Sequence, residues 1–253
     1  MTETHGANGS RQWFDIVTLV LAVLAIVFAI VQFVDSYVQK KELNAISDSM
    51  STHFIGEFPK NILQITQVAS QSTKTLDVMV DFPGYGHYSS PEEFKRYFRT
   101  LIDLRTDKRI AVRMLIYDAK LGSDSRNRQL RPSFEKRMQT TAFLHFFKDE
   151  HPGIEMPKNY DEFDQKMTEL QKKYEQELAE NGIYIRHTST PLMFFLWLED
   201  GEDAVFSFLN NEEGSTELSF RTRDSALIRT FKDTFEQLWK ASQISPIKTH
   251  PSS

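Results

Sequence analysis

The sequence predicts an α/β domain with a mixed sheet flanked by helices, preceded by a single transmembrane helix and a helical stalk. A strand–helix–strand pattern over residues 76–117 indicates two parallel strands joined by a crossover helix. Short apolar stretches between residues 183 and 220 have the length and turn signals of further strands. An uncharged apolar run near the N-terminus is long enough to cross a bilayer.

Composition removes several kinds of chemistry. The chain of 253 residues contains no cysteine, which excludes a disulfide framework, a thiolate zinc site and a cysteine nucleophile. It has 30 Lys and Arg against 35 Asp and Glu, a formal net charge of −5, and this mild acidity argues against a general nucleic-acid binder. Because no histidines show metal-ligand spacing such as His-x-x-x-His, we expect no metal and no cofactor.

Residues 13–34 are predicted to form a transmembrane helix that acts as a signal anchor. In the uncharged part of this run only Thr18 and Gln32 are polar. About 20 helical residues match the roughly 30 Å hydrocarbon core of a bilayer, and Trp13 and Tyr37 flank the run as interfacial residues do. A cleaved signal peptide is disfavoured because the run is too long and no small-x-small site follows. The lipid bilayer is therefore the first expected partner.

Basic residues near the two ends of this helix favour a cytoplasmic C-terminal domain. Lys40 and Lys41 follow the helix, whereas Arg11 is the basic residue that precedes it. The cytoplasmic side of a membrane span carries the excess of Lys and Arg. Two lysines against one arginine is a small margin, so a periplasmic domain stays open. The expected protein is single-pass, in a membrane such as a bacterial inner membrane.

The other boundaries follow from changes in periodicity. A polar tail over residues 1–12 precedes the transmembrane helix, and residues 35–58 are predicted as a helical stalk. The α/β domain is expected over residues 59–243, followed by a flexible tail over 244–253. The stalk has an apolar stripe at spacings of 3, 4 and 4, formed by Leu43, Ile46, Met50 and Phe54. This stripe fits equally a helix that packs on its own domain and a helix that pairs with a second copy.

Helices and strands alternate through the α/β domain. Strands are predicted at residues 76–82, 110–117, 183–186, 191–198, 204–209 and 218–220. Helices are predicted after Pro59, from Pro91, and at residues 134–148, 161–180 and 224–241. Ser90 is expected to cap the helix that has Pro91 in its first position.

A basic segment over residues 120–137 is predicted as a polar, mobile loop. Its cations are Lys120, Arg126, Arg128, Arg131, Lys136 and Arg137. On a tethered domain such a loop can rest on anionic lipid or bind nucleic acid. A solvated loop balanced by the acidic turns elsewhere is the preferred interpretation, because mixed surface charge is ordinary.

Residues 182–241 resemble the phospholipase D superfamily, and the resemblance extends over about residues 60–241. Members carry a strand reading H-x-K-x-x-x-x-D-G, then a second strand, a G-S-x-N-like turn, an acidic residue and a helix ending in F-x-x-L/W. The corresponding residues here are Met193, Phe195, Asp200, Gly201, Ser207, Asn210, Glu217, Phe235 and Leu238. The resemblance implies one half-domain of a phospholipase D-like fold. Since catalytic members combine two half-domains, it also implies a homodimer or another protein partner.

The departures from this pattern point away from catalysis. Met193 stands at the position of the nucleophilic histidine, Phe195 at that of the phosphate-binding lysine, and Asn210 is one place off the family spacing. The family chemistry needs an imidazole to form a covalent intermediate and an ammonium to hold phosphate. A thioether and a benzyl group do neither. The leading interpretation is a pseudoenzyme: a membrane-anchored binding, scaffolding or regulatory module.

Local charge agrees with that interpretation. Between residues 192 and 220 there is no Lys or Arg, and the acidic residues are Glu199, Asp200, Glu202, Asp203, Glu212, Glu213 and Glu217. A phosphodiester site needs positive potential, so this stretch does not favour one. Two alternatives stay open. The first is a tethered phosphodiesterase or nuclease-like hydrolase with a rearranged site built from His87, His187 and Asp118. The second is a sensor that transmits a signal through the stalk.

Overall fold

The computed structural model describes residues 51–87, 89–140, 143, 147, 155–208 and 217–244. The predicted tail, transmembrane helix and most of the stalk fall within residues 1–50 and lie outside the described residues, as does the tail beyond residue 244. Within the described ranges, no helix is both long and apolar enough to cross a membrane.

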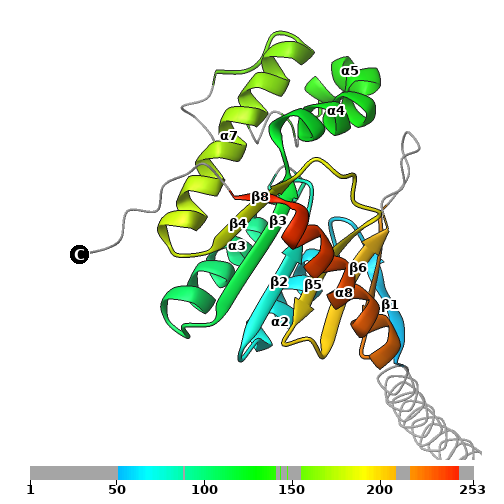
Figure 1. Ribbon diagram of the computed structural model, residues 1–253. Coiled ribbons are helices and arrows are strands. Elements are labelled where there is room, and N and C mark those ends of the chain that lie inside the picture. The colour runs from blue at the N-terminus through cyan, green and yellow to red at the C-terminus, as the bar shows by residue number, and fades with distance from the viewer. Residues whose placement is uncertain are drawn as a thin grey trace, which may run out of the picture. The chain divides into compact units, whose positions relative to one another are not determined.

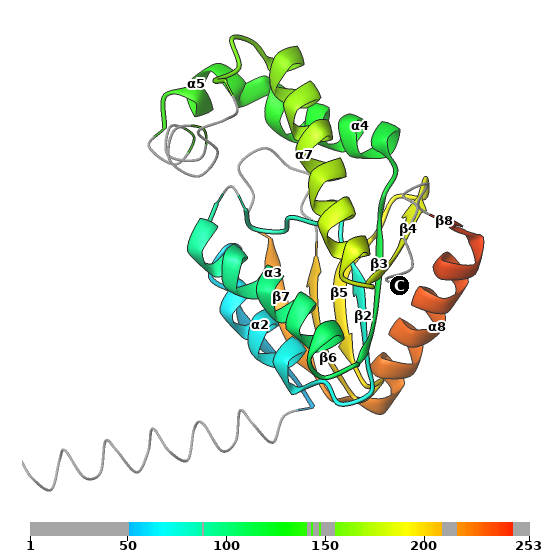
Figure 2. The ribbon, with the colours of Figure 1, turned by 90° about the vertical axis from the view of Figure 1, so that its left-hand side faces the viewer.

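The described chain forms an eight-stranded mixed sheet with helices on both faces (Figures 1 and 2). The strands are β1 (Thr52–Glu57), β2 (Thr75–Met79), β3 (Ala111–Tyr117), β4 (Tyr184–Thr188), β5 (Phe194–Glu199), β6 (Asp203–Phe208), β7 (Leu218–Thr222) and β8 (Gln243–Ile244). Their order in the sheet is β1-β7-β6-β5-β2-β3-β4-β8. The β2–β3 and β3–β4 pairs are parallel, which confirms the predicted crossover unit, and the other pairs are antiparallel.

Two helical groups cover the sheet. The helices are α2 (Ile62–Gln71), α3 (Pro91–Thr106), α4 (Ala119–Leu130), a short 3₁₀ turn (Arg131–Ser133), α5 (Phe134–Met138), α7 (Tyr160–Glu180) and α8 (Ser225–Ala241). In Figure 2, α2 and α3 lie on one face of the sheet and α8 lies on the other. Helices α4 and α5 extend beyond the end of β3, and α7 descends from this group beside β3 and β4 (Figures 1 and 2). The helices predicted from apolar stripes after Pro59, from Pro91, over 161–180 and over 224–241 are all present.

Each face of the sheet has a polar contact inside apolar packing. Towards α2 and α3, the fully buried Trp197 of β5 donates its indole N–H to the Tyr97 hydroxyl at 2.8 Å. Towards α8, Arg113 interrupts an otherwise apolar β3 and donates to Asp77 at 2.7 Å. The Arg113 guanidinium also lies 4.8 Å from the ring centroid of Phe235, so α8 covers it with an aromatic face. Buried polar groups of this kind are tolerated because they are paired.

The prediction of a helical stalk over residues 35–58 is wrong for residues 52–57. Residues 52–57 form β1, an edge strand that pairs antiparallel with β7. Phe54, the last residue of the predicted helical stripe, contacts Phe220 across the two strands, with the ring centroids 5.6 Å apart. Pairing with a distant strand overrides the local helical periodicity, as long-range contacts often do.

The basic segment is helical rather than a mobile loop, and the prediction was wrong there. Asp118 caps α4 by accepting from the backbone N–H of Leu121 at 2.7 Å. Polar contacts hold α4 on α7: Arg126 donates to Asp164 at 2.8 Å, and Ser123 donates to the same carboxylate. A helix docked by polar contacts carries a weak apolar stripe, so periodicity does not reveal it. The predicted helix over 134–148 is interrupted, because α5 ends at Met138, whereas Phe143 and Phe147 are again helical.

Candidate functional site

The positions that correspond to the family motif lie side by side in the middle of the sheet. Phe195 of β5 is opposite Ser207 of β6, which is opposite Ser219 of β7. Because side chains alternate along a strand and partners across strands share a face, all three point to the α2 side. Phe195 is 3% exposed and its ring meets that of Tyr85 edge to face at 5.8 Å. The lysine position of the family is thus filled by a buried aromatic side chain.

A connected set of buried polar groups surrounds Phe195. Asn61, just before α2, donates through Nδ2 to the Tyr85 hydroxyl at 2.8 Å and to Ser219 Oγ at 2.6 Å. The Tyr85 hydroxyl donates to Glu217 Oε1 at 2.5 Å. Ser207 Oγ and Ser219 Oγ are 2.6 Å apart. Both serines and Asn61 are fully buried, whereas Glu217 at the end of the network is partly exposed.

The electrostatics of the network favour neutral groups. Burial, and to a smaller extent the nearby Asp81, raises the pKa of Glu217 to about 7. Burial raises the pKa of Asp81 to about 6 in spite of the Arg126 charge. Burial and the adjacent Glu217 raise the pKa of Tyr85 well above its ordinary value. Tyr85 therefore stays protonated and donates a hydrogen bond, and it supplies no nucleophile or base.

Met193 and Asn210 behave differently from Phe195. Met193, at the position of the family's nucleophilic histidine, precedes β5 and is 84% exposed. Asn210 lies outside the described residues. Of the two substituted catalytic positions, one is therefore in solvent and the other is in the core.

Asp200 holds the turn between β5 and β6 against the segment before β2. Its carboxylate accepts from the backbone N–H groups of Thr73, Lys74 and Thr75, the last two at 2.8 Å. Although burial alone would raise it, these hydrogen bonds hold the pKa of Asp200 below its ordinary value. Its backbone has a φ of 50°, which Asp and Asn tolerate better than most residues. This motif position is explained by structure alone.

Replacing Asp200 with alanine is expected to lower the free energy of unfolding by about 2 kcal/mol, because charge-assisted hydrogen bonds are lost. Asp200→Asn keeps the tolerance for positive φ and one acceptor oxygen, so it should cost less. Because the folded-state pKa is lowered, the loss in Asp200→Ala is full above the ordinary pKa of the carboxyl and shrinks as the pH falls below it. Chemical denaturation of the full chain in detergent micelles at several pH values measures this. Equal costs for the two variants would contradict the assigned role.

The three residues of the rearranged-site alternative take separate partners. His187 Nε2 is 2.9 Å from Glu175 Oε2. Asp118 caps α4. His87 Nδ1 is 2.5 Å from the Gly84 carbonyl oxygen, and its ring stacks on Phe82 at 4.8 Å. Among the described residues, no group of three or more His, Asp or Glu side chains is placed to hold a metal ion.

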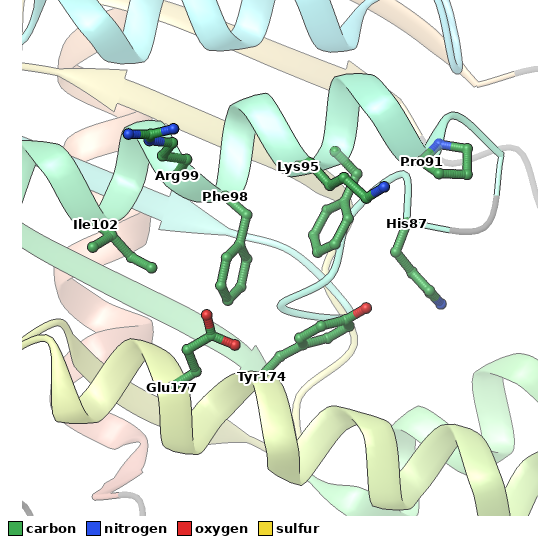
Figure 3. Close-up of a pocket in the computed structure, with 9 residues that line it drawn as sticks. His87, Pro91, Lys95, Phe98, Arg99, Ile102, Tyr174 and Glu177 are labelled. Atoms are coloured by element: carbon green, nitrogen blue, oxygen red, sulfur yellow. The ribbon is translucent and has the colours of Figure 1, made fainter. Parts of the chain in front are cut away.

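A groove of about 360 Å³ lies between α3 and α7 (Figure 3). Its floor is aromatic: the rings of Phe94, Phe98 and Tyr174 are 5.2 to 5.4 Å apart. Figure 3 shows that both ionic and apolar side chains line it, and the remaining lining residues are His87, Pro91, Lys95, Arg99, Ile102 and Glu177. The volume and the apolar floor with a few polar groups match those of small-molecule sites.

The sequence singled out His87, which lines this groove, but as part of a site with His187 and Asp118, and the cationic side of the groove was missed. Lys95 and Arg99 are one helical turn apart, beside the stripe of Phe94 and Phe98 that the sequence identifies as buried. A pair of cations at i and i+4 next to an aromatic stripe was the available signal. The opposite wall comes from α7, and the packing of α7 on α3 is not visible in the sequence.

The basic segment is only partly free to bind. Arg126 pairs with Asp164 and with Thr168 Oγ1 at 2.9 Å. Arg131 pairs with Asp161 and lies over the Tyr160 ring at 4.8 Å. Lys120, Arg128 and Lys136 are exposed, and the side chain of Arg137 lies outside the described residues. Part of the predicted cationic surface therefore serves to dock α4 on α7.

No family model matches this sequence, and no curated protein matches it. Among solved structures, the chain is similar to Nuc from Salmonella typhimurium, a phospholipase D family member, with 11% identity and a TM-score of 0.44 over 77% of this chain and 97% of that one. It is also similar to TrmBL2, an archaeal chromatin protein, with 10% identity and a TM-score of 0.41 over 95% of this chain and 71% of that one. NucT from Helicobacter pylori has 8% identity to this chain and a TM-score of 0.37, over 76% of this chain and 98% of that one. At such scores these similarities assign no activity or ligand to the chain.

Proposed function

We propose that this protein is a membrane-anchored, catalytically inactive, phospholipase D-like module that binds or scaffolds. The observation that carries the proposal is the environment of Phe195. The side chain at the lysine position of the family is buried against Tyr85, opposite Ser207, beside a largely buried polar network. An active site of this family needs a cation there to hold phosphate. Here the same space is core.

The anchoring part of the proposal rests on the sequence. The uncharged apolar run over residues 13–34 has the length of a transmembrane helix. Lys40 and Lys41 after it favour a cytoplasmic domain in a bacterial inner membrane. A homodimer or another protein partner is part of the same proposal. Binding of anionic lipid or nucleic acid by the basic segment is a weaker part, because two of its arginines pair within the domain.

The groove between α3 and α7 is the candidate binding surface of the module. Its aromatic floor suits an apolar group, and the ionic side chains at its edge suit a ligand or peptide side chain with polar ends. The groove is lined by α3, α7 and His87, whereas the network around Phe195 is built from β5, β6 and β7 with Asn61 and Tyr85, so the two share no residue. Binding there does not require the lost catalytic residues.

Purified full chain in detergent micelles is expected to show no turnover of bis(p-nitrophenyl) phosphate or of phosphatidylcholine above a buffer background. The physical reason is that Phe195 and Met193 stand where the family chemistry needs a phosphate-binding cation and a nucleophile. The measurement is release of p-nitrophenol, and of choline, over time. Reproducible turnover that is abolished in His87→Ala, His187→Ala or Asp118→Asn would support the hydrolase alternative and contradict the proposal.

A further inference from the structure

The two edges of the sheet are not equivalent. At one edge β4 is covered by the short strand β8. At the other edge β1 is the outermost strand of the described chain, with β7 on its inner side alone (Figure 1). An open strand edge presents unpaired N–H and C=O groups and pairs readily with another strand unless it is protected. The six residues of β1 include no proline and no lysine, Glu57 at its end is the one acidic residue, and a register shift between Phe54 and Gly56 limits the regular edge to Thr52–Phe54.

The ladder with β7 shows which backbone groups of β1 face outward. The N–H of Arg223 donates to the carbonyl of Ser51, so these two residues form a hydrogen-bonded pair, and Thr52 is opposite Thr222. Hydrogen-bonded and non-hydrogen-bonded pairs alternate in an antiparallel ladder. His53 therefore points its backbone groups to β7, whereas Thr52 and Phe54 point theirs to the open side.

The exposed side chain at this edge is apolar. Phe54 is 54% exposed, although its ring touches Phe220. A Cβ added at Gly56 would meet no atom within 4 Å, so the face of the sheet is also open at that residue. An edge strand with free backbone groups and a large exposed aromatic side chain is suited to pairing with a further strand.

We propose that β1 pairs antiparallel with β1 of a second copy of this chain, around a two-fold axis at His53. In this register Thr52 of each copy faces Phe54 of the other, and both residues have outward-facing backbone groups. Counting only residues 51–54 of each strand, about four interchain hydrogen bonds then form, whereas an axis at Thr52 or at Phe54 gives about two. The edge is therefore complementary to itself, which is what a closed two-fold dimer requires.

The same register buries apolar surface. Residues opposite each other share a face of the sheet, so each Phe54 ring lies over Thr52 of the other copy. The proposed membrane anchor adds to this, because it holds copies in one plane with one orientation and raises their effective concentration. The inference specifies the self-association included in the proposed function. Its test measures strand pairing and not catalysis, so the two can fail separately.

The absence of cysteine from the whole chain allows a direct test. In the proposed register the two copies of residue 53 form a non-hydrogen-bonded pair, with Cα atoms about 4.5 Å apart, which lies within the range that a disulfide spans. Full-length His53→Cys in membranes, oxidised with copper phenanthroline, is expected to give at least about tenfold more disulfide-linked dimer than Ser70→Cys, because the two thiols are held together. Ser70 is exposed near the C-terminal end of α2 and is not part of β1.

A second variant separates pairing from chance collision. Thr52→Pro removes an outward-facing N–H from an edge strand, where proline is tolerated, and is expected to abolish the dimer in the His53→Cys background. Thr52→Val loses the same hydroxyl contact with Thr222 but keeps the N–H, and should retain the dimer. Dimer formation by His53→Cys no better than by Ser70→Cys would overturn the proposal. Equal crosslinking in the proline and valine variants, or crosslinking by Phe54→Cys and not by His53→Cys, would also overturn it.

Discussion

Phe195→Ala is expected to lower the free energy of unfolding by about 3–5 kcal/mol, whereas Met193→Ala changes it by no more than about 0.5 kcal/mol. The two positions are two residues apart and correspond to the two catalytic positions of the family motif. Phe195 is buried between the sheet and Tyr85, so alanine leaves a cavity. Met193 is 84% exposed and leaves none.

The measurement is urea denaturation of the full chain in detergent micelles, followed by the fluorescence of the buried Trp197. Phe195→Met is the matched control, because a flexible side chain of nearly the same volume refills the space at a cost below about 1.5 kcal/mol. If Phe195→Ala and Met193→Ala were equally mild, residue 195 would not be a core residue. The case for a closed motif site would then be lost.

Glu217→Gln is expected to remove a pH dependence of stability of about 3 kcal/mol between pH 4 and pH 8. The pKa of Glu217 rises from its ordinary 4.5 to about 7 in the folded state, chiefly because the side chain is buried. Between these two values the folded state holds more protons than the unfolded state. Stability conferred by this group is therefore full at low pH and is lost as the pH rises towards the folded-state pKa.

The quantity to measure is the difference in unfolding free energy between wild type and Glu217→Gln across that pH range. It should fall as the pH rises, because glutamine keeps a neutral acceptor for the Tyr85 hydroxyl at every pH. Asp81 contributes a pH dependence of stability of the same sign, because its folded-state pKa is raised to about 6. Asp81→Asn, introduced into both wild type and Glu217→Gln, therefore separates the two contributions. A difference that stays constant with pH would show that Glu217 is not buried within the network.

Parts of the fold with strong local patterns were predictable. The alternation of apolar residues in β2 and the apolar run of β3 identify the parallel pair, and the stripe of α7 identifies the longest described helix. Local patterns failed where a distant partner decides the structure. β1 is a strand because β7 pairs with it, and α4 is a helix that Asp118 caps and the Arg126–Asp164 contact docks.

The candidate site also has features that the sequence predicts and features that depend on distant contacts. That Met193 and Phe195 cannot perform the family chemistry is visible in the sequence, because it depends only on residue type. That Phe195 is covered by Tyr85 and by a network from Asn61 to Glu217 is not visible, because these residues come from a turn, a helix start and a strand start. Asp200 shows that a residue which matches the family motif can still have a structural role, because its carboxylate holds a turn.

The central claim, that the motif site is closed and inactive, is tested most directly by looking for a covalent phosphoryl–protein adduct. The full chain in detergent micelles is incubated with a ³²P-labelled phosphodiester, quenched in alkali, which preserves phosphohistidine, and digested for peptide mapping. The account predicts no label on any peptide, because Phe195 and Met193 replace the groups that the chemistry requires. Stoichiometric label on a peptide containing His87 or His187 would contradict it.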